Sequence, residues 1–258
     1  MSKKFILAGA VLALGFGQVV TAQTNLQIFY DFGRDRHHVT TTLEGFYGDN
    51  WGNTFFFIDH DFNGKDANGK VESPSGTYME IARCFNFWQN TKLGGLSLQA
   101  EYNGGVYNGY NIKNAFLTGF DYFLHSKDFR YTFNFKVLYK YIQNTTQKVP
   151  MQFTFVWGMQ DLFGLKGLRF SGFADFWWED HALFSGPKWD KAIDGYEVLG
   201  TSETSPFVFI SEPQLWYNVG QWFGCPNLNI GGEVELSWDF GTVKGFHARP
   251  CAGVKWVF

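Results

Sequence analysis

The sequence lacks any long apolar run beyond its N-terminal segment. A membrane-spanning helix needs roughly twenty consecutive apolar residues, and no stretch after residue 20 approaches that length. Hydrophobic residues nevertheless make up 45% of the chain, at a mean hydropathy of -0.19. Any membrane crossing must therefore be made by strands, because only a closed barrel otherwise satisfies its backbone hydrogen bonds in lipid.

The one long apolar run, residues 5–20, has the form of a secretory signal. It follows Lys3 and Lys4 and ends in Val20-Thr21-Ala22 before Gln23. A charged start, an apolar centre and a small residue at the end are typical of a signal peptide, and the run is too short for a membrane anchor. We expect a signal peptide over residues 1–22 and one outer-membrane β-barrel over residues 23–258, since no Pro/Ser-rich linker divides the remainder.

Cysteine is scarce, and basic charge is not in excess. The three cysteines, Cys84, Cys225 and Cys251, are too few for a disulfide scaffold and lack the spacing of a zinc site. Whether any two of them pair is open. The net charge of -3 argues against the basic stripe of a nucleic-acid-binding protein. We therefore expect no cofactor, no bound metal and no nucleic-acid partner.

Aromatic residues, by contrast, are plentiful. They make up 20% of the chain, and Phe alone occurs 30 times, which is more than an ordinary core requires. A transmembrane barrel uses such residues in a lipid-facing band and in girdles at both membrane interfaces.

Residues 227–258 show the pattern that the rest of the chain follows. Apolar residues alternate with polar or charged ones over residues 228–239, and the alternation resumes over residues 247–258. A strand of a soluble sandwich has about five or six residues, so these longer strands fit a barrel with lipid outside and water inside. A lysine in place of Val234 or Leu236 is thus expected to destabilise the folded barrel. A lysine in place of Glu235 is expected to be tolerated, because the side chain at 235 meets water.

The same period of two divides the mature chain into about twelve segments. An even number places both chain ends on one side of the membrane, and the longest connections, residues 63–76 and 181–206, then share the opposite, outer side. The sequence predicts an all-β fold: a single transmembrane antiparallel up-and-down β-barrel of about 12 strands. The segments are residues 26–32, 38–47, 54–62, 77–87, 96–103, 114–124, 129–141, 151–157, 168–178, 207–218, 228–239 and 247–258.

Two positions interrupt this pattern. Arg83 shares the parity of the apolar residues of its segment, so either a bulge shifts the register or Arg83 lies near a membrane interface. Pro213 cannot donate a backbone hydrogen bond and must lie at a bulge or a gap in the ladder.

Ionisable residues recur on the polar face of the strands. Eight strands leave a filled interior, whereas sixteen to eighteen leave an aqueous channel, so a barrel of intermediate size implies a narrow passage. The charges could line a solute path, or they could only pair across the lumen and stiffen the barrel. They are Glu44, Asp59, Glu80, Glu101, Lys136, Arg169, Asp175, Glu212, Glu233, Glu235, Arg249 and Lys255.

Short motifs along nearly the whole mature chain resemble one family. They are Gly48-Asp49 through Phe57-Ile58-Asp59, Tyr78-Met79-Glu80-Ile81, Ser171-Gly172-Phe173-Ala174-Asp175, Ser211-Glu212-Pro213-Gln214-Leu215 and the ending Val254-Lys255-Trp256-Val257-Phe258. In this order they resemble the nucleoside-specific channel-forming outer-membrane proteins, the Tsx family. The resemblance implies a twelve-stranded barrel in the outer membrane of a Gram-negative bacterium, through which nucleosides diffuse.

The resemblance also implies where a nucleoside-like solute would bind. Phe57 and Phe173 share a face with Asp59 and Asp175, so the rings could stack on a base while the carboxylates accept hydrogen bonds from ribose. The rings could equally only pack the lumen. The terminal Phe258 resembles the ending of barrels delivered by the barrel assembly machinery. The expected substrate-binding residues are Phe57, Asp59, Glu80, Glu101, Lys136, Arg169, Phe173, Asp175 and Glu212.

Two other functions fit a barrel of this size. An outer-membrane lipid hydrolase would need a serine activated by a histidine, but most of the six histidines are near predicted loops or strand ends and none has a His-x-Ser-Asn neighbourhood. We therefore expect no enzymatic activity. A closed structural or adhesive barrel acting through its outer loops is the remaining alternative.

Overall fold

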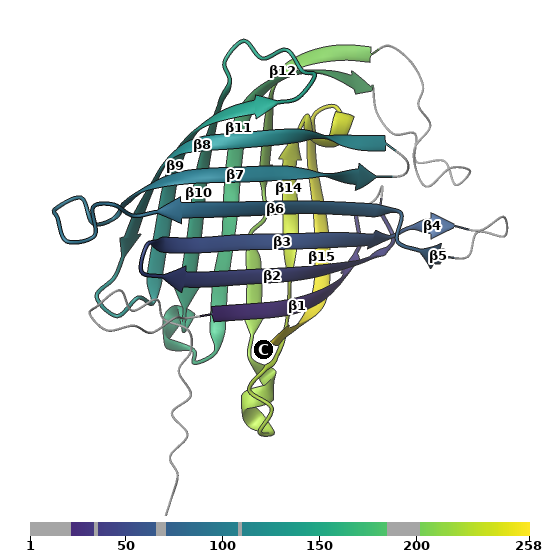
Figure 1. Cartoon of the computed structure of the whole chain (residues 1–258). Coiled ribbons are helices and arrows are strands. Elements are labelled where there is room, and N and C mark those ends of the chain that lie inside the picture. The colour runs from purple at the N-terminus through teal and green to yellow at the C-terminus, as the bar shows by residue number, and fades with distance from the viewer. Residues whose placement is uncertain (1–21, 34–35, 66–70, 108–109, 185–201) are drawn as a thin grey trace, which may run out of the picture.

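The strands form one closed wall. The computed structural model describes residues 22–33, 36–65, 71–107, 110–184 and 202–258 (Figure 1). Within these residues, twelve strand positions surround a common axis. The wall strands are β1 (Ala22–Asp31), β2 (Val39–Asp49), β3 (Gly52–Phe62), β6 (Gly76–Phe85), β7 (Leu96–Tyr107), β8 (Tyr110–His125), β9 (Tyr131–Ile142), β10 (Met151–Gln160), β11 (Leu168–Phe184), β12 (Ser202–Ser211) with β13 (Gln214–Tyr217), β14 (Leu228–Trp238) and β15 (Phe246–Val257).

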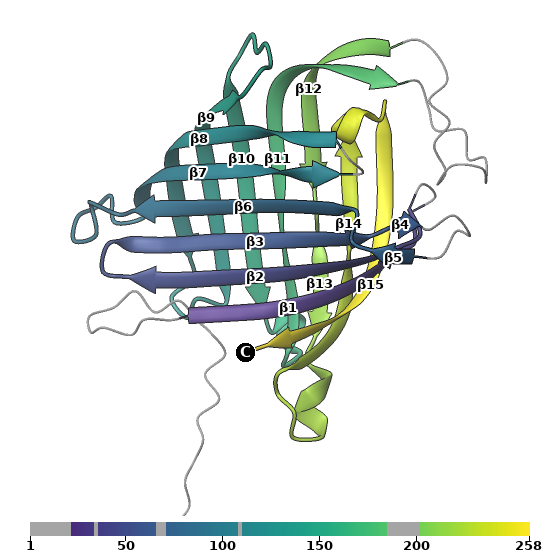
Figure 2. The same cartoon turned by 45° about the vertical axis from the view of Figure 1, so that its right-hand side comes forward.

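Every wall strand pairs antiparallel with its neighbours, and the last strand returns to the first. β15 pairs with β1 from Asn25 opposite Val257 to Asp31 opposite Cys251, so no edge remains open (Figure 2). The amide of Phe258 also donates to the carbonyl of Thr24 at 2.9 Å. Both described ends of the chain therefore lie at one rim, and the predicted up-and-down barrel is confirmed.

β12 and β13 together make a single wall strand that is interrupted at Pro213. On either side of the gap the two segments keep the same register with β11 and with β14, and between Ser211 and Gln214 only Glu212 and Pro213 fall outside the ladder. The pairing of β11 with β12 shifts register further along, between Trp178 and His181. The Pro213 carbonyl still accepts from the amide of Val234 at 3.1 Å. Of the two predictions for Pro213, the gap is confirmed.

β6 carries no bulge. Its pairing with β3 and with β7 runs without a shift from Gly76 to Phe85. Arg83 therefore lies on the outer face, near the strand end, where it pairs with Asp49 at 2.8 Å. Of the two predictions for Arg83, its position near an end of the barrel is confirmed and the register shift is wrong.

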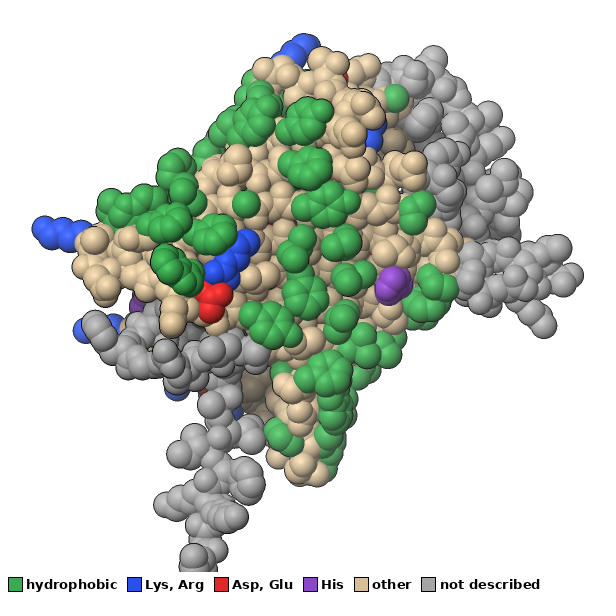
Figure 3. Space-filling view, in the orientation of Figure 1, with side chains coloured by type: hydrophobic (Ala, Val, Ile, Leu, Met, Phe, Trp, Pro, Cys, Tyr) green, Lys and Arg blue, Asp and Glu red, His purple; other side chains and the backbone are tan. Residues whose placement is uncertain are grey.

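The outer face of the wall is apolar. Figure 3 shows hydrophobic side chains spread over the strands, with few charged ones among them. Large apolar residues of alternate positions stay exposed, as at Ile28, Phe120, Phe135 and Val254. A band of this kind meets lipid at little cost, whereas in water it would associate with other molecules. This surface is that of a protein that spans a membrane.

The connections between strands differ at the two rims. The predicted long connection after β3 contains a small hairpin of β4 (Gly64–Lys65) and β5 (Val71–Ser73). The other long connection, between β11 and β12, falls mostly outside the described residues, as does the expected signal peptide. Short 3-10 turns follow β10 (η1, Leu162–Gly164), β13 (η2, Val219–Trp222) and β14 (η3, Phe240–Thr242). None of the helical segments in the described chain is long and apolar enough to cross a membrane.

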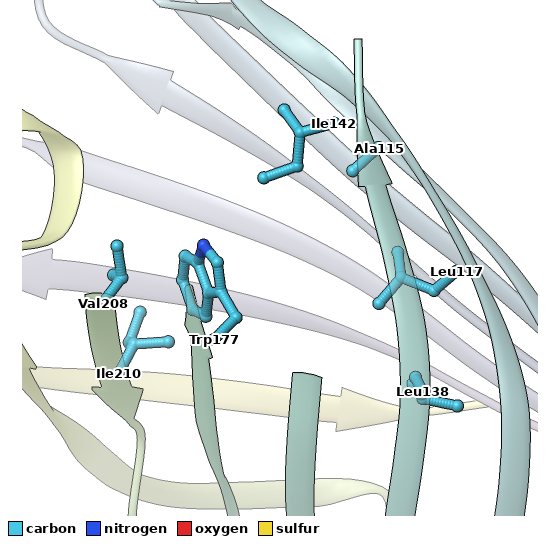
Figure 4. Packing of buried hydrophobic residues seen from close by; sticks show 7 residues of the cluster. All are labelled: Ala115, Leu117, Leu138, Ile142, Trp177, Val208 and Ile210. Carbon is cyan, nitrogen blue, oxygen red and sulfur yellow. The ribbon is translucent and has the colours of Figure 1, made fainter. Parts of the chain in front are cut away.

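The interior holds an apolar cluster that alternation alone did not predict. Its members project inward from β8, β9, β11 and β12, with Trp177, Val208 and Ile210 in one group in Figure 4. Phe173 and Phe240 pack against it. Part of the lumen is therefore filled by side chains. The cluster comprises Ala115, Leu117, Leu138, Ile142, Trp177, Val208 and Ile210.

Candidate functional site: the barrel lumen

All nine predicted site residues face the lumen. Strand pairing, which is unshifted at eight of these positions, places those eight on the inner face of the wall. Glu212 lies in the gap and interacts with the inward Asp59 and Glu233. Each also keeps partial exposure, whereas other inward polar residues such as Gln27, Gln99 and Arg249 are almost fully buried. A solute in the lumen could therefore contact all nine residues, which are Phe57, Asp59, Glu80, Glu101, Lys136, Arg169, Phe173, Asp175 and Glu212.

Two Phe-x-Asp segments stand on opposite walls. Phe57 and Asp59 lie on β3, and Phe173 and Asp175 lie on β11, six strands away in either direction around the barrel. Side chains two apart on one strand share a face, so each wall presents a ring beside a carboxylate. The arrangement gives the lumen two similar binding faces.

Contacts on β6 connect these opposite walls. The Tyr78 hydroxyl donates to Glu80 Oε1 at 2.6 Å, and the Tyr78 ring lies 5.9 Å from that of Phe57. Glu80 interacts electrostatically with Glu101 and with Asp175 across the lumen. The carboxylates of these two walls therefore face one another across the lumen.

A second acidic group lies between β3 and the β12–β14 wall. The Thr42 hydroxyl donates to Asp59 Oδ1 at 2.5 Å, and Gln214 Nε2 donates to Glu233 Oε2 at 2.8 Å. Asp59 and Glu233 both interact electrostatically with Glu212. Each carboxylate keeps at least one lone pair free for a solute hydroxyl or amine.

Glu235 is part of a buried ionic network and does not line open space. It is 5% exposed and lies between Arg36, at 2.7 Å, and Arg249, at 2.5 Å. Arg249 also donates to the Ser237 hydroxyl at 3.1 Å, and Arg36 lies 3.4 Å from Asp31. The expectation that Glu235 meets water is therefore wrong, and we expect a lysine there to be unfavourable, because it would place a third positive charge against two arginines. For this group, charge pairing that stiffens the barrel is the better description.

Two inward lysines are covered by tryptophan rings. Lys140 Nζ lies 3.8 Å from the Trp177 ring and donates to Gln152 Oε1 at 2.7 Å, and Lys255 Nζ lies 4.1 Å from the Trp216 ring. Both lysines are less than a tenth exposed. Cation–π contacts of this kind hold the charge against the wall. Of the predicted lumen bases, Lys136 and Arg169 are the ones that keep partial exposure.

Sequence reasoning missed Tyr78 as a lumen residue. It shares parity with Glu80, so the signal was present, but Arg83 made the register of this segment ambiguous. Two predicted residues have an unsatisfied polar atom, Asp175 Oδ1 and Arg169 Nε. Buried groups without a partner cost free energy, which makes both suitable partners for water or for a solute.

The three cysteines are free thiols, so none of the possible disulfides forms. Cys84 is buried beside Gln99 and Asp121, at 3.4 and 3.5 Å. In the described parts of the chain, no three His, Cys, Asp or Glu side chains converge in a way that could hold a metal ion.

Comparison with solved structures supports the fold. A porin, NanC, solved in a rhombohedral crystal form, superposes with a TM-score of 0.52 at 8% identity, over 90% of this chain and 98% of that chain. Weaker likeness is found to OpdK of Pseudomonas aeruginosa with vanillate (TM-score 0.39, 7% identity, 92% of this chain, 98% of that chain). OprD from Pseudomonas aeruginosa is similar at a TM-score of 0.38 and 12% identity, over 91% of this chain and 65% of that chain.

Comparison of sequences gives the family. A search of curated protein sequences finds no match. A family model, described as a domain of unknown function (DUF5020), matches residues 22–258, which include every barrel strand. The chain belongs to the DUF5020 family.

Proposed function

We propose that this protein is a channel through which small solutes diffuse across the outer membrane of a Gram-negative bacterium. The observation that carries the proposal is the partial exposure of ionisable and aromatic side chains on the inner face of a closed, lipid-facing barrel. A purely structural barrel of this size would be expected to pair or bury those groups, as this one does with Glu235 and Arg249.

We further propose that nucleosides are the preferred solutes. The support is the motif resemblance to the Tsx family together with the two Phe-x-Asp segments on opposite walls. Phe57 and Phe173 offer faces on which a flat base can stack, and Asp59 and Asp175 can accept hydrogen bonds from ribose hydroxyls.

The charge of the lumen argues against anionic solutes. Among the nine site residues, the carboxylates of Asp59, Glu80, Glu101, Asp175 and Glu212 outnumber the bases of Lys136 and Arg169. Like charges facing one another in a narrow, partly desolvated passage repel strongly. A nucleoside should therefore enter much faster than its monophosphate.

Uptake into vesicles tests the proposal. We expect vesicles that contain the protein to admit a nucleoside faster than a sugar of similar size, and a nucleoside monophosphate slowest. Asp59→Ala, Asp175→Ala and Phe173→Ala should each reduce the nucleoside preference several-fold, since one hydrogen bond is worth about 1 kcal/mol. Asp128→Ala, in an exposed turn, and Phe116→Ala, on the lipid face, are the matched controls. Equal rates for all three solutes would contradict the proposed nucleoside preference and would indicate a channel without solute selectivity.

A closed structural or adhesive barrel is the second candidate, and the interior apolar cluster favours it. Single-channel recording in a planar bilayer separates the two, because a filled barrel gives no conductance steps. We also propose that the barrel assembly machinery recognises the C-terminal strand that ends in Phe258.

A further inference from the structure

The connection between β14 and β15, residues 239–245, folds inward over the apolar cluster. The Phe240 ring packs edge-on against that of Trp177, with centroids 6.3 Å apart and planes at 88°. Val243 is only 8% exposed. The Ser205 hydroxyl donates to Asp239 Oδ2 at 2.7 Å, which ties the loop to β12. The loop therefore covers part of the lumen at the rim opposite the chain ends, where it follows β14 in yellow in Figure 1.

The turn geometry alone does not require this inward position. The connection between β10 and β11, at the other rim, has a similar sequence: Asp161-Leu162-Phe163-Gly164-Leu165-Lys166-Gly167 against Asp239-Phe240-Gly241-Thr242-Val243-Lys244-Gly245. In both turns the aspartate has a positive φ, of 49° and 53°, and accepts from the final glycine amide. Leu165 is nevertheless 57% exposed, in contrast to its buried counterpart Val243. Contacts made by the β14–β15 loop to other strands decide its position.

One of these contacts depends on protonation. His181, near the end of β11, lies between two backbone carbonyl oxygens, with Nδ1 2.9 Å from that of Glu179 and Nε2 2.7 Å from that of Asp239. A carbonyl oxygen can only accept, and a neutral imidazole has a single N–H. Both hydrogen bonds can form only when the ring carries two protons. In the neutral form, a nitrogen lone pair would face one carbonyl oxygen at hydrogen-bond distance.

Charged groups lie near His181 on β9, β11 and the β14–β15 loop. Glu179 and Asp180 adjoin it on β11, and the Glu179 carboxylate accepts from Trp177 Nε1 at 2.9 Å. Lys140 on β9 interacts with Glu179. From the loop, the Asp239 carboxylate already accepts from Ser205 and from the Gly245 amide. β12 places Ser205 directly opposite His181.

We propose that the β14–β15 loop is a movable constriction at one mouth of the lumen, and that the imidazolium form of His181 holds it closed. Loss of the second proton removes one hydrogen bond and introduces a repulsion, so the loop is released as the pH rises. Phe240 then leaves the apolar cluster, Val243 becomes exposed, and the mouth widens. The effect on solute entry rests on the proposed channel function, whereas the loop movement does not.

A spin label on the loop tests the movement without reference to transport. The label is attached at Thr242→Cys, an exposed loop position, in the full chain carrying Cys84→Ala, Cys225→Ser and Cys251→Ser. The protein is reconstituted in lipid vesicles and its spectrum recorded at pH 5 and pH 8. We expect an immobilised label at pH 5 and a several-fold larger mobile fraction at pH 8.

Two histidine variants identify the group responsible. In His181→Gln the label should give the same spectrum at both pH values, because an amide does not titrate. In His247→Gln the response should persist, since His247 Nε2 contacts a single carbonyl, that of Lys244, which a neutral ring already satisfies. No change with pH in the wild-type background, or an unchanged response in His181→Gln, would overturn the proposal.

Bilayer conductance then reports the consequence for the mouth. Wild-type conductance should be higher at pH 8 than at pH 5, and Phe240→Ala should be high at both. If the label responds to pH but no variant conducts, the loop is held by His181 while the channel function fails. If channels conduct but the label never moves, the proposed constriction fails and the channel stands.

Discussion

Neighbouring residues on one strand of this barrel meet different solvents. Val234 and Glu233 are adjacent on β14, and Val234 points toward lipid while Glu233 points into the lumen. A lysine near mid-membrane on the lipid face costs about 2–4 kcal/mol. In the lumen, a lysine at 233 would meet the carboxylates of Asp59 and Glu212.

We therefore expect Val234→Lys to destabilise the folded barrel by about 2–4 kcal/mol and Glu233→Lys to have a much smaller effect. Urea unfolding in lipid vesicles measures both. Equal losses of stability would mean that the inward and outward faces of β14 are wrongly placed.

Glu235, the next acidic residue on the inner face, is buried, so we expect its substitution to affect stability more than that of Glu233. Its carboxylate offsets Arg36 and Arg249, and removing one partner of a buried pair costs about 3–5 kcal/mol. We expect Glu235→Gln to lower the free energy of unfolding by about that amount and Glu235→Lys to lower it further. Glu101→Gln, at a partly exposed site, is the control. A stable Glu235→Lys barrel would show that the network contributes little.

The sequence identified the inner face at each of these positions but not the depth of burial. Alternation with period two fixes the wall on which a side chain lies, whereas the groups that meet across the lumen depend on strand tilt and closure. Glu235 and Glu233 are therefore equivalent by parity, yet the structure buries the first between arginines and leaves the second partly exposed. The covering of Lys140 by Trp177 was unpredictable for the same reason.

At the scale of elements, β11 is shaped around the gap in its neighbour. Gly172 has a φ of 157°, and a methyl group there would lie 2.4 Å from the Glu212 carbonyl oxygen and 2.7 Å from the Trp157 ring. Backbone cannot move aside as a side chain can. The glycine is thus required where β11 passes the interruption at Pro213.

We expect Gly172→Ala to destabilise the barrel by about 1–3 kcal/mol and to displace Glu212, with a change in solute preference. Gly158→Ala on β10 is the matched control, because its new methyl group would meet only the Thr132 hydroxyl, which can rotate. The midpoint of thermal unfolding in detergent checks the comparison. A smaller shift for Gly172→Ala than for Gly158→Ala would contradict this account.

Element boundaries were predictable to the extent that each strand has one apolar face. The missing donor of Pro213 predicted a bulge or a gap, and strand pairing decided for the gap. The ambiguity at Arg83 was likewise resolved only by pairing with β3 and β7. The inward fold of the β14–β15 loop could not be predicted, because the similar β10–β11 turn leaves Phe163 and Leu165 exposed. Long-range contacts decide between these outcomes.

At the scale of the whole molecule, the final residue contributes to closure. The Phe258 amide bonds to Thr24 on the first strand, and its ring is 68% exposed on the lipid side. We expect deletion of Phe258 to reduce the amount of folded barrel recovered from membranes, through both the lost bond and weaker delivery by the assembly machinery. Heat-modifiable mobility on a gel distinguishes folded from unfolded protein, and a normal yield would count against this role.

The pairing of β15 with β1 is also expected to be a late step in the folding of the barrel. The two strands stand at opposite ends of the chain, and such distant pairings form slowly because loop closure must come first. Until the last strand arrives, a growing barrel presents two unpaired edges that can bind other chains. A protein shortened by one strand should therefore yield aggregates and not a narrower pore, because every wall strand must be present before the barrel can close.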